Sequence, residues 1–257
     1  KGLLPTPSKS HYTFNLRDFS RVVQGVLLQE PSDQFQNKPS VMRLWTHEAL
    51  RVFGDRLTDD TDRQWMCDHC SAMCKEVFKC DFQSEFDHIR PADETETGYG
   101  TLRRLFWGDY MTPADEDERP YAEVPDLQQL QERTEEALSD FNSASKKPME
   151  LVMFMFAIEH VSRIARVLRM PGGNALLVGV GGSGRQSLSI LATEMAGYQL
   201  FRIEITKSYG MTEWREDLKT VLIEAGAGDR PLVFLFSDTQ ISMESFVEDI
   251  NNMLNAG

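Results

Sequence analysis

The stretch Leu-Leu-Val-Gly-Val-Gly-Gly-Ser-Gly-Arg-Gln-Ser occupies residues 176–187 and decides the fold of the chain around it. The apolar residues 175–178 predict a buried strand, and a helix is predicted over about 185–196. Glycines between a strand and a helix let the backbone curl, so that successive N–H groups point at one anion. The positive end of the helix adds to the same spot. The pattern therefore predicts a phosphate-binding loop.

This loop matches the pattern G-x-x-x-x-G-K-[ST] only in part. Gly179 and Gly184 stand at its two glycines, but Arg185 replaces the lysine and Gln186 replaces the hydroxyl residue. Arginine pairs well with phosphate, whereas glutamine offers Mg²⁺ only an amide oxygen. The alternative is a purely structural glycine turn. The predicted nucleotide-binding residues of the loop are Gly179, Val180, Gly181, Gly182, Ser183, Gly184, Arg185, Gln186 and Ser187, of which Ser187 is also a candidate Mg²⁺ ligand.

A second apolar strand is predicted over 232–236, and it is followed by Asp238. In P-loop enzymes an aspartate in this place holds Mg²⁺, directly or through water. The alternative for Asp238 is a helix N-cap or a turn residue. Hydrolytic members place a glutamate at the next position, which is Thr239 here. A threonine cannot act as a general base at neutral pH, so no catalytic residue is predicted.

Strands and helices alternate in the second half of the chain, which predicts a parallel α/β sheet. Residues 1–90 instead follow helical spacing, with Asn15 as an N-cap and Asp18 in the first turn. A short hairpin is expected around residues 99–110. The other predicted strand covers 199–205, and the other predicted helices cover about 40–53, 59–77, 126–141, 148–169, 212–225 and 243–255.

The composition restricts the class of partner. The formal net charge is −13, which makes general binding to nucleic acids or anionic membranes unfavourable. No run approaches the roughly 20 apolar residues that span a bilayer. Cys67, Cys70, Cys74 and Cys80 include half of a zinc knuckle, but no second pair follows. Because the first three share one helix face, we expect them to be buried as small apolar residues.

Several long motifs resemble the fourth AAA+ module of an axonemal dynein heavy chain. They are G-V-G-G-S-G-R-Q-S-L at 179–188, I-E-I-T-K-S-Y-G at 203–210, V-F-L-F-S-D-T-Q-I at 233–241 and E-D-I-N-N-M-L-N-A-G at 248–257. Residues 11–25 resemble the helical small subdomain that closes the third module. The resemblance implies an incomplete α/β P-loop AAA+ large subdomain over 121–257, preceded by an all-α AAA+ small subdomain over 1–120.

The same resemblance implies roles for individual residues. The loop would hold ATP or ADP, with Mg²⁺ at Asp238, and Val124 would lie beside the adenine. Arg17 would serve the nucleotide of the preceding module. With Thr239 in place of the glutamate, the site would bind nucleotide with turnover slower by about 10²–10⁴. The alternatives are a structural module with an empty site, which only transmits conformational change, and a small-molecule P-loop kinase.

The resemblance also implies a setting for the whole polypeptide. The partners would be the rest of the heavy-chain ring, microtubules, and dynein intermediate and light chains, with no nucleic acid and no membrane. The location would be the cytoplasm, the cytoskeleton and the axoneme of the cilium. In the family, the strand between the loop strand and the Asp238 strand comes later than Gly257. We therefore expect this chain to be a segment of a longer polypeptide.

Overall fold

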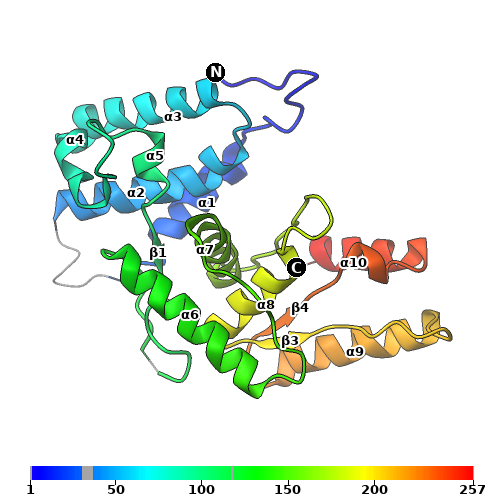
Figure 1. Cartoon of the computed structure of the whole chain (residues 1–257). Helices are drawn as coiled ribbons and strands as arrows, with labels where there is room; N and C mark the ends of the chain where they lie inside the picture. The colour runs from blue at the N-terminus through cyan, green and yellow to red at the C-terminus, as the bar shows by residue number, and fades with distance from the viewer. Residues whose placement is uncertain (1, 31–36, 117, 257) are drawn as a thin grey trace. The chain divides into compact units, whose positions relative to one another are not determined.

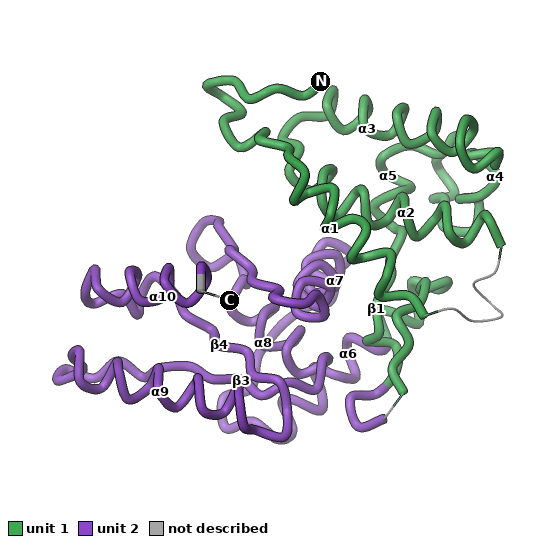
Figure 2. Tube along the Cα trace, turned by 180° about the vertical axis from the view of Figure 1, so that it is seen from behind, with its two compact units in different colours: residues 1–112, 118–132 green, residues 113–117, 133–257 purple. Residues whose placement is uncertain are grey.

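The computed structural model describes residues 2–30, 37–116 and 118–256, and the chain divides into two compact units (Figures 1 and 2). Unit 1 comprises Lys1–Thr112 with Glu118–Glu132, and unit 2 comprises Pro113–Asp117 with Arg133–Gly257. In the described ranges, no helix combines the length and the apolar character needed to cross a membrane.

Unit 1 is helical and contains one small sheet. Its first helix starts where predicted, because the Asn15 side chain accepts hydrogen bonds from the N–H groups of Arg17 and Asp18. The Asp18 carboxylate accepts from the Asn15 N–H in return, which completes a capping box. The elements are α1 (Leu16–Val26), α2 (Lys38–Val52), α3 (Asp60–Met73), a π-helical turn (Cys74–Phe78), α4 (Phe82–Glu85), α5 (Tyr99–Leu102), β1 (Trp107–Gly108) and β2 (Ala122–Glu123), with 3₁₀ turns at Gly54–Arg56 and Asp87–Ile89.

The predicted burial of three cysteines is confirmed. Cys67, Cys70 and Cys74 are buried in the core of unit 1, against residues of α2 and α4. Burial penalises the thiolate and raises the pKa of Cys67 to about 11 and that of Cys74 to about 12, and it raises the pKa of Cys70 further. These thiols therefore act as packing groups at neutral pH.

The hairpin predicted around residues 99–110 is wrong. Tyr99–Leu102 form helix α5, in which the Thr101 hydroxyl accepts a hydrogen bond from the Gly98 N–H. Strand β1 pairs instead with the later strand β2, antiparallel, with Trp107 opposite Glu123. The local cap over residues 98–101 favours a helical turn, so the strand partner comes from farther along the chain.

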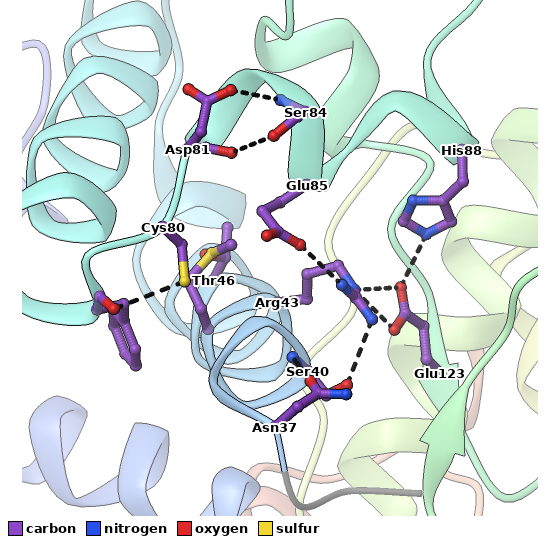
Figure 3. Close-up of polar contacts among 12 residues, drawn as sticks. Asn37, Ser40, Arg43, Thr46, Cys80, Asp81, Ser84, Glu85, His88 and Glu123 are labelled. Carbon is purple, nitrogen blue, oxygen red and sulfur yellow. Dashed lines mark hydrogen bonds and ion pairs between the residues drawn. The ribbon is translucent and has the colours of Figure 1, made fainter.

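An ion-pair cluster fastens strand β2 to the helices of unit 1 (Figure 3). Arg43 of α2 donates from Nε to both oxygens of Glu123, at 3.1 and 2.9 Å, and from Nη1 to Glu85 at 3.3 Å. The His88 Nε2 lies 3.0 Å from Glu123 Oε1. Burial opposes the ionisation of Glu123, but the hydrogen bond with His88 and the charge of Arg43 outweigh it, so the pKa of this carboxyl is lowered.

Unit 2 is built on two parallel strands with helices around them. Strand β3 (Gln199–Phe201) pairs with β4 (Leu232–Phe234), and Gln199 lies opposite Leu232. Its core centres on Trp214, which stacks on Phe246 at 4.3 Å between ring centroids. The helices are α6 (Leu127–Ala144, shared with unit 1), α7 (Met155–Arg169), α8 (Arg185–Met195), α9 (Met211–Ala227) and α10 (Glu244–Ala256), with a 3₁₀ turn at Asp238–Gln240. Helices α7 and α8 pack side by side (Figure 1).

The strand predicted over 175–178 is not formed. In the structure this segment has no regular pairing, and the side chains of Leu176 and Val178 are 89% and 85% exposed. A parallel strand requires backbone partners, and within the described residues the parallel sheet contains only β3 and β4. The two strands that do form are also shorter than predicted, since pairing ends at Phe201 and Phe234.

The helix predicted over 148–169 begins later, at Met155. The Asn142 side chain binds the backbone of Met149 from both sides: its Oδ1 accepts from the Met149 N–H at 2.7 Å, and its Nδ2 donates to the Met149 carbonyl at 2.9 Å. The bond to the carbonyl uses the acceptor that a helix starting at Pro148 would need, and residues 151–154 lie outside the helix.

Because the pKa of Glu123 is lowered on folding, its stabilising contribution is present above its ordinary pKa of 4.5 and is lost as pH falls through the folded value. We expect Glu123→Gln to destabilise the β1–β2 pairing by roughly 1.5–3 kcal/mol at pH 7, typical of hydrogen bonds to a charged group. Hydrogen exchange of the Val124 amide, which donates to Phe106, measures this opening. Glu96→Gln, at an exposed carboxylate, is the control; equal exchange in both variants would contradict the prediction.

Candidate nucleotide site

The glycine loop makes a sharp turn directly before α8. Gly182 and Gly184 have φ values of 76° and 77°, in the left-handed region that favours glycine. Helix α8 begins at Arg185, and Gly184 at its N-cap supplies no side-chain hydrogen bond. The first N–H groups of the helix therefore face a position where an anion can accept from them. The turn and the helix start agree with the predicted phosphate loop, although the strand before them is absent.

Arg185 folds back across the loop. Its Nη2 donates to the carbonyl oxygen of Val180 at 3.1 Å. Within the part of the chain that the structure describes, this guanidinium forms no ion pair with a carboxylate. Its positive charge is therefore available to a phosphate that displaces the carbonyl contact.

Gln186 and Ser187 follow in the first turn of α8. The Gln186 side-chain oxygen accepts a hydrogen bond from Arg202 Nη2 at 3.2 Å, so it is already engaged by a cation. The Ser187 side chain is half-buried. Arg202 was not among the predicted site residues, because it lies in a stretch that reads as a strand and only the fold brings it to α8.

The end of β4 is fixed by a buried glutamine. Gln240 accepts from the Ser237 N–H at 2.7 Å and donates from Nε2 to the Ile203 carbonyl at 2.7 Å. Ser237 is the N-cap of the 3₁₀ turn, so Asp238 is not a cap, but it is the first residue of that turn, which agrees with the turn-residue alternative. Asp238 and Thr239 are both exposed, and the Thr239 hydroxyl lies 3.0 Å from that of Ser237. Gln240 is a second residue that sequence reasoning missed.

The donor groups can be tested for Mg²⁺, which takes oxygen ligands and keeps several waters. The Asp238 carboxylate forms no hydrogen bond or ion pair with any residue that the structure describes. The Ser187 hydroxyl is a second oxygen donor, while the Gln186 oxygen is occupied by Arg202. A carboxylate and a hydroxyl are oxygen donors of the kind that Mg²⁺ accepts, with phosphates and water completing its coordination. In the described ranges, no hydrogen bond or ion pair joins Asp238 to the loop.

The two remaining predicted residues belong to unit 1. Val124 is buried, and its N–H donates to the Phe106 carbonyl at 2.9 Å. Arg17 is exposed in the first turn of α1. Their predicted roles stay predictions.

Models of known families match both parts of the chain. Residues 1–89 match the AAA+ lid domain, and residues 149–257 match the P-loop containing dynein motor region D4. The predicted fold class, an AAA+ lid followed by an incomplete P-loop large subdomain, is confirmed.

The chain is similar over its whole length to dynein axonemal heavy chain 3, with 51% identity to the mouse protein (Mus musculus) and 50% to the human protein (Homo sapiens) over 257 residues. It is 47% identical over 255 residues to dynein axonemal heavy chain 1 of Mus musculus. The chain spans only 6% of the length of each of these relatives. With half of its residues shared across the entire chain, and with its loop matching the dynein motor region, the chain belongs to the axonemal dynein heavy chain family.

Proposed function

We propose that this part of a dynein motor binds ATP or ADP at residues 179–187 and turns it over slowly or not at all. The turn at Gly182 and Gly184 carries the proposal, because it opens the first N–H groups of α8 toward an anion. Phosphate oxygens would accept from these N–H groups, and Arg185 would exchange its bond with Val180 for a stronger, charge-assisted one.

The slow turnover rests on the residues at the end of β4. Hydrolysis needs a group that takes a proton from the attacking water. Thr239 is hydrogen-bonded to the Ser237 hydroxyl, and a hydroxyl does not ionise near neutral pH. Asp238, with Ser187, would hold Mg²⁺, which would neutralise phosphate charge when bound.

In this proposal the site regulates the parent protein. The similarity to axonemal heavy chains supports a setting in the motor ring of a ciliary axoneme, where the whole protein would move along microtubules and bind intermediate and light chains. Val124 would lie beside the adenine, and Arg17 would serve the nucleotide of the preceding module. Both roles rest on the family resemblance.

One observation favours a second function, a module whose nucleotide site stays empty and which only transmits conformational change. The Arg185 Nη2 donates to the loop's own carbonyl at Val180, a contact that a bound phosphate would have to replace. The two functions differ in whether nucleotide shows saturable binding at this loop.

We expect Arg185→Ala to weaken nucleotide binding at this loop by roughly tenfold to a hundredfold, since it removes the charged donor. Photolabelling of the full heavy chain with an azido-adenine nucleotide, followed by peptide mapping, measures this site separately from others. Labelled peptides from other modules serve as the folding control. If the unsubstituted chain shows no saturable labelling here, the empty-module function holds instead.

We expect Thr239→Glu combined with Gln186→Thr to raise ATP turnover at this site, by about 10²-fold where a general base is all that was lacking. The single change Thr239→Glu keeps Gln186 paired with Arg202 and serves as the matched comparison. The readout is the additional steady-state ATPase activity of the full heavy chain. An increase that survives a further Arg185→Ala change would not arise at this loop.

A further inference from the structure

A second arginine lies at the glycine loop. Arg202 directly follows β3, and its Nη2 donates to the side-chain oxygen of Gln186 at 3.2 Å. Gln186 is the neighbour of Arg185 in the first turn of α8. One hydrogen bond between distant parts of unit 2 therefore holds two guanidinium groups at the same helix start.

Acidic residues lie near Arg202, but none of those that the structure describes forms an ion pair with it. Its side chain borders a depression that also contains four carboxylates, those of Glu204, Glu213, Glu216 and Asp217. Three of these are engaged elsewhere: Asp217 accepts from the Tyr209 hydroxyl, Glu213 accepts from the Gly210 N–H at 2.9 Å, and Glu216 lies 3.6 Å from Lys219 Nζ. Over the described parts of the chain, Arg202 has no carboxylate within ion-pair distance.

Arg185 and Arg202 share one property. Each gives a hydrogen bond to a neutral oxygen, of Val180 and of Gln186 respectively, and neither forms an ion pair with a carboxylate among the described residues. A guanidinium prefers the paired oxygens of a phosphate to a single amide oxygen, because two parallel charge-assisted bonds then form. Two such groups beside open helix N–H groups match the several negative charges of a nucleoside di- or triphosphate.

We propose that Arg202 is a second phosphate-binding residue of the loop, acting together with Arg185 on a nucleoside di- or triphosphate. The inference rests on the proposed nucleotide binding at residues 179–187. Gln186 holds the Arg202 side chain in place before the ligand arrives, and the phosphate oxygens take over its Nη2 donor on binding. Since the contact is a direct ion pair, it does not require Mg²⁺.

The test uses the full heavy chain and the azido-adenine photolabel, titrated with and without Mg²⁺. We expect Arg202→Gln to raise the half-saturating concentration at this segment about tenfold, which corresponds to roughly 1.4 kcal/mol. The increase is expected in both conditions, whereas Asp238→Asn should weaken labelling only when Mg²⁺ is present. Arg202→Lys should recover part of the affinity, because it restores a point charge without the planar fork.

Arg215→Gln is the matched control, since Arg215 is an exposed arginine of unit 2 on α9 and its loss changes the net charge equally. Equal titrations for Arg202→Gln and Arg215→Gln, with labelling still weakened in Arg185→Ala, would overturn the inference and leave the proposed function intact. Loss of the Arg202→Gln effect in a Gln186→Ala background would also overturn it, because the arginine would then act only through Gln186. Absence of saturable labelling in the unsubstituted chain would overturn the proposed function itself.

Discussion

The curl of the backbone between Val180 and Arg185 is the constraint on which the site depends. Two glycines at positive φ turn the chain sharply enough for α8 to start at Arg185 without a side-chain cap. A residue with a Cβ atom would be strained at either position. With this turn, the positive end of α8, the guanidinium of Arg185 and the first-turn side chains Gln186 and Ser187 all lie at one place. None of these groups would point at a common ligand if the segment were extended.

The second half of the site is held by side-chain contacts rather than by a long sheet. Pairing between β3 and β4 ends at Phe201 and Phe234. Beyond the strands, Gln240 links the two segments by bonding both the Ser237 N–H and the Ile203 carbonyl. The stacked rings of Trp214 and Phe246 lie in the hydrophobic core of unit 2, together with Ile203. A buried amide that satisfies two backbone groups fixes the position of Asp238 and Thr239 more firmly than two short strands could.

Local features of this chain could be predicted from its sequence, and features that depend on distant partners could not. The N-cap at Asn15, with Asp18 in the first turn, and the start of α8 are set by residues within one turn of each other, and both are confirmed. The strand expected over 175–178 would need backbone partners, and no described residue pairs with it, so it does not form. The hairpin expected around residues 99–110 failed for the same reason, since β1 pairs with a strand beyond the predicted turn. Arg202 carries no local signal, because an arginine next to a strand reads as an exposed residue.

The net charge of −13 gives little information about the potential at the loop. Charges in water are screened within about 8–10 Å at physiological ionic strength, so the nearest groups dominate. Around α8 these are Arg185, Arg202 and the helix N–H groups, while the carboxylates beside Arg202 bond to Tyr209, Gly210 and Lys219. Excess acidity elsewhere disfavours extended polyanions, which would contact a large surface. In the proposed function, a compact phosphate ester would reach these donors at the helix start without lying along the acidic remainder of the surface, which a nucleic acid could not avoid.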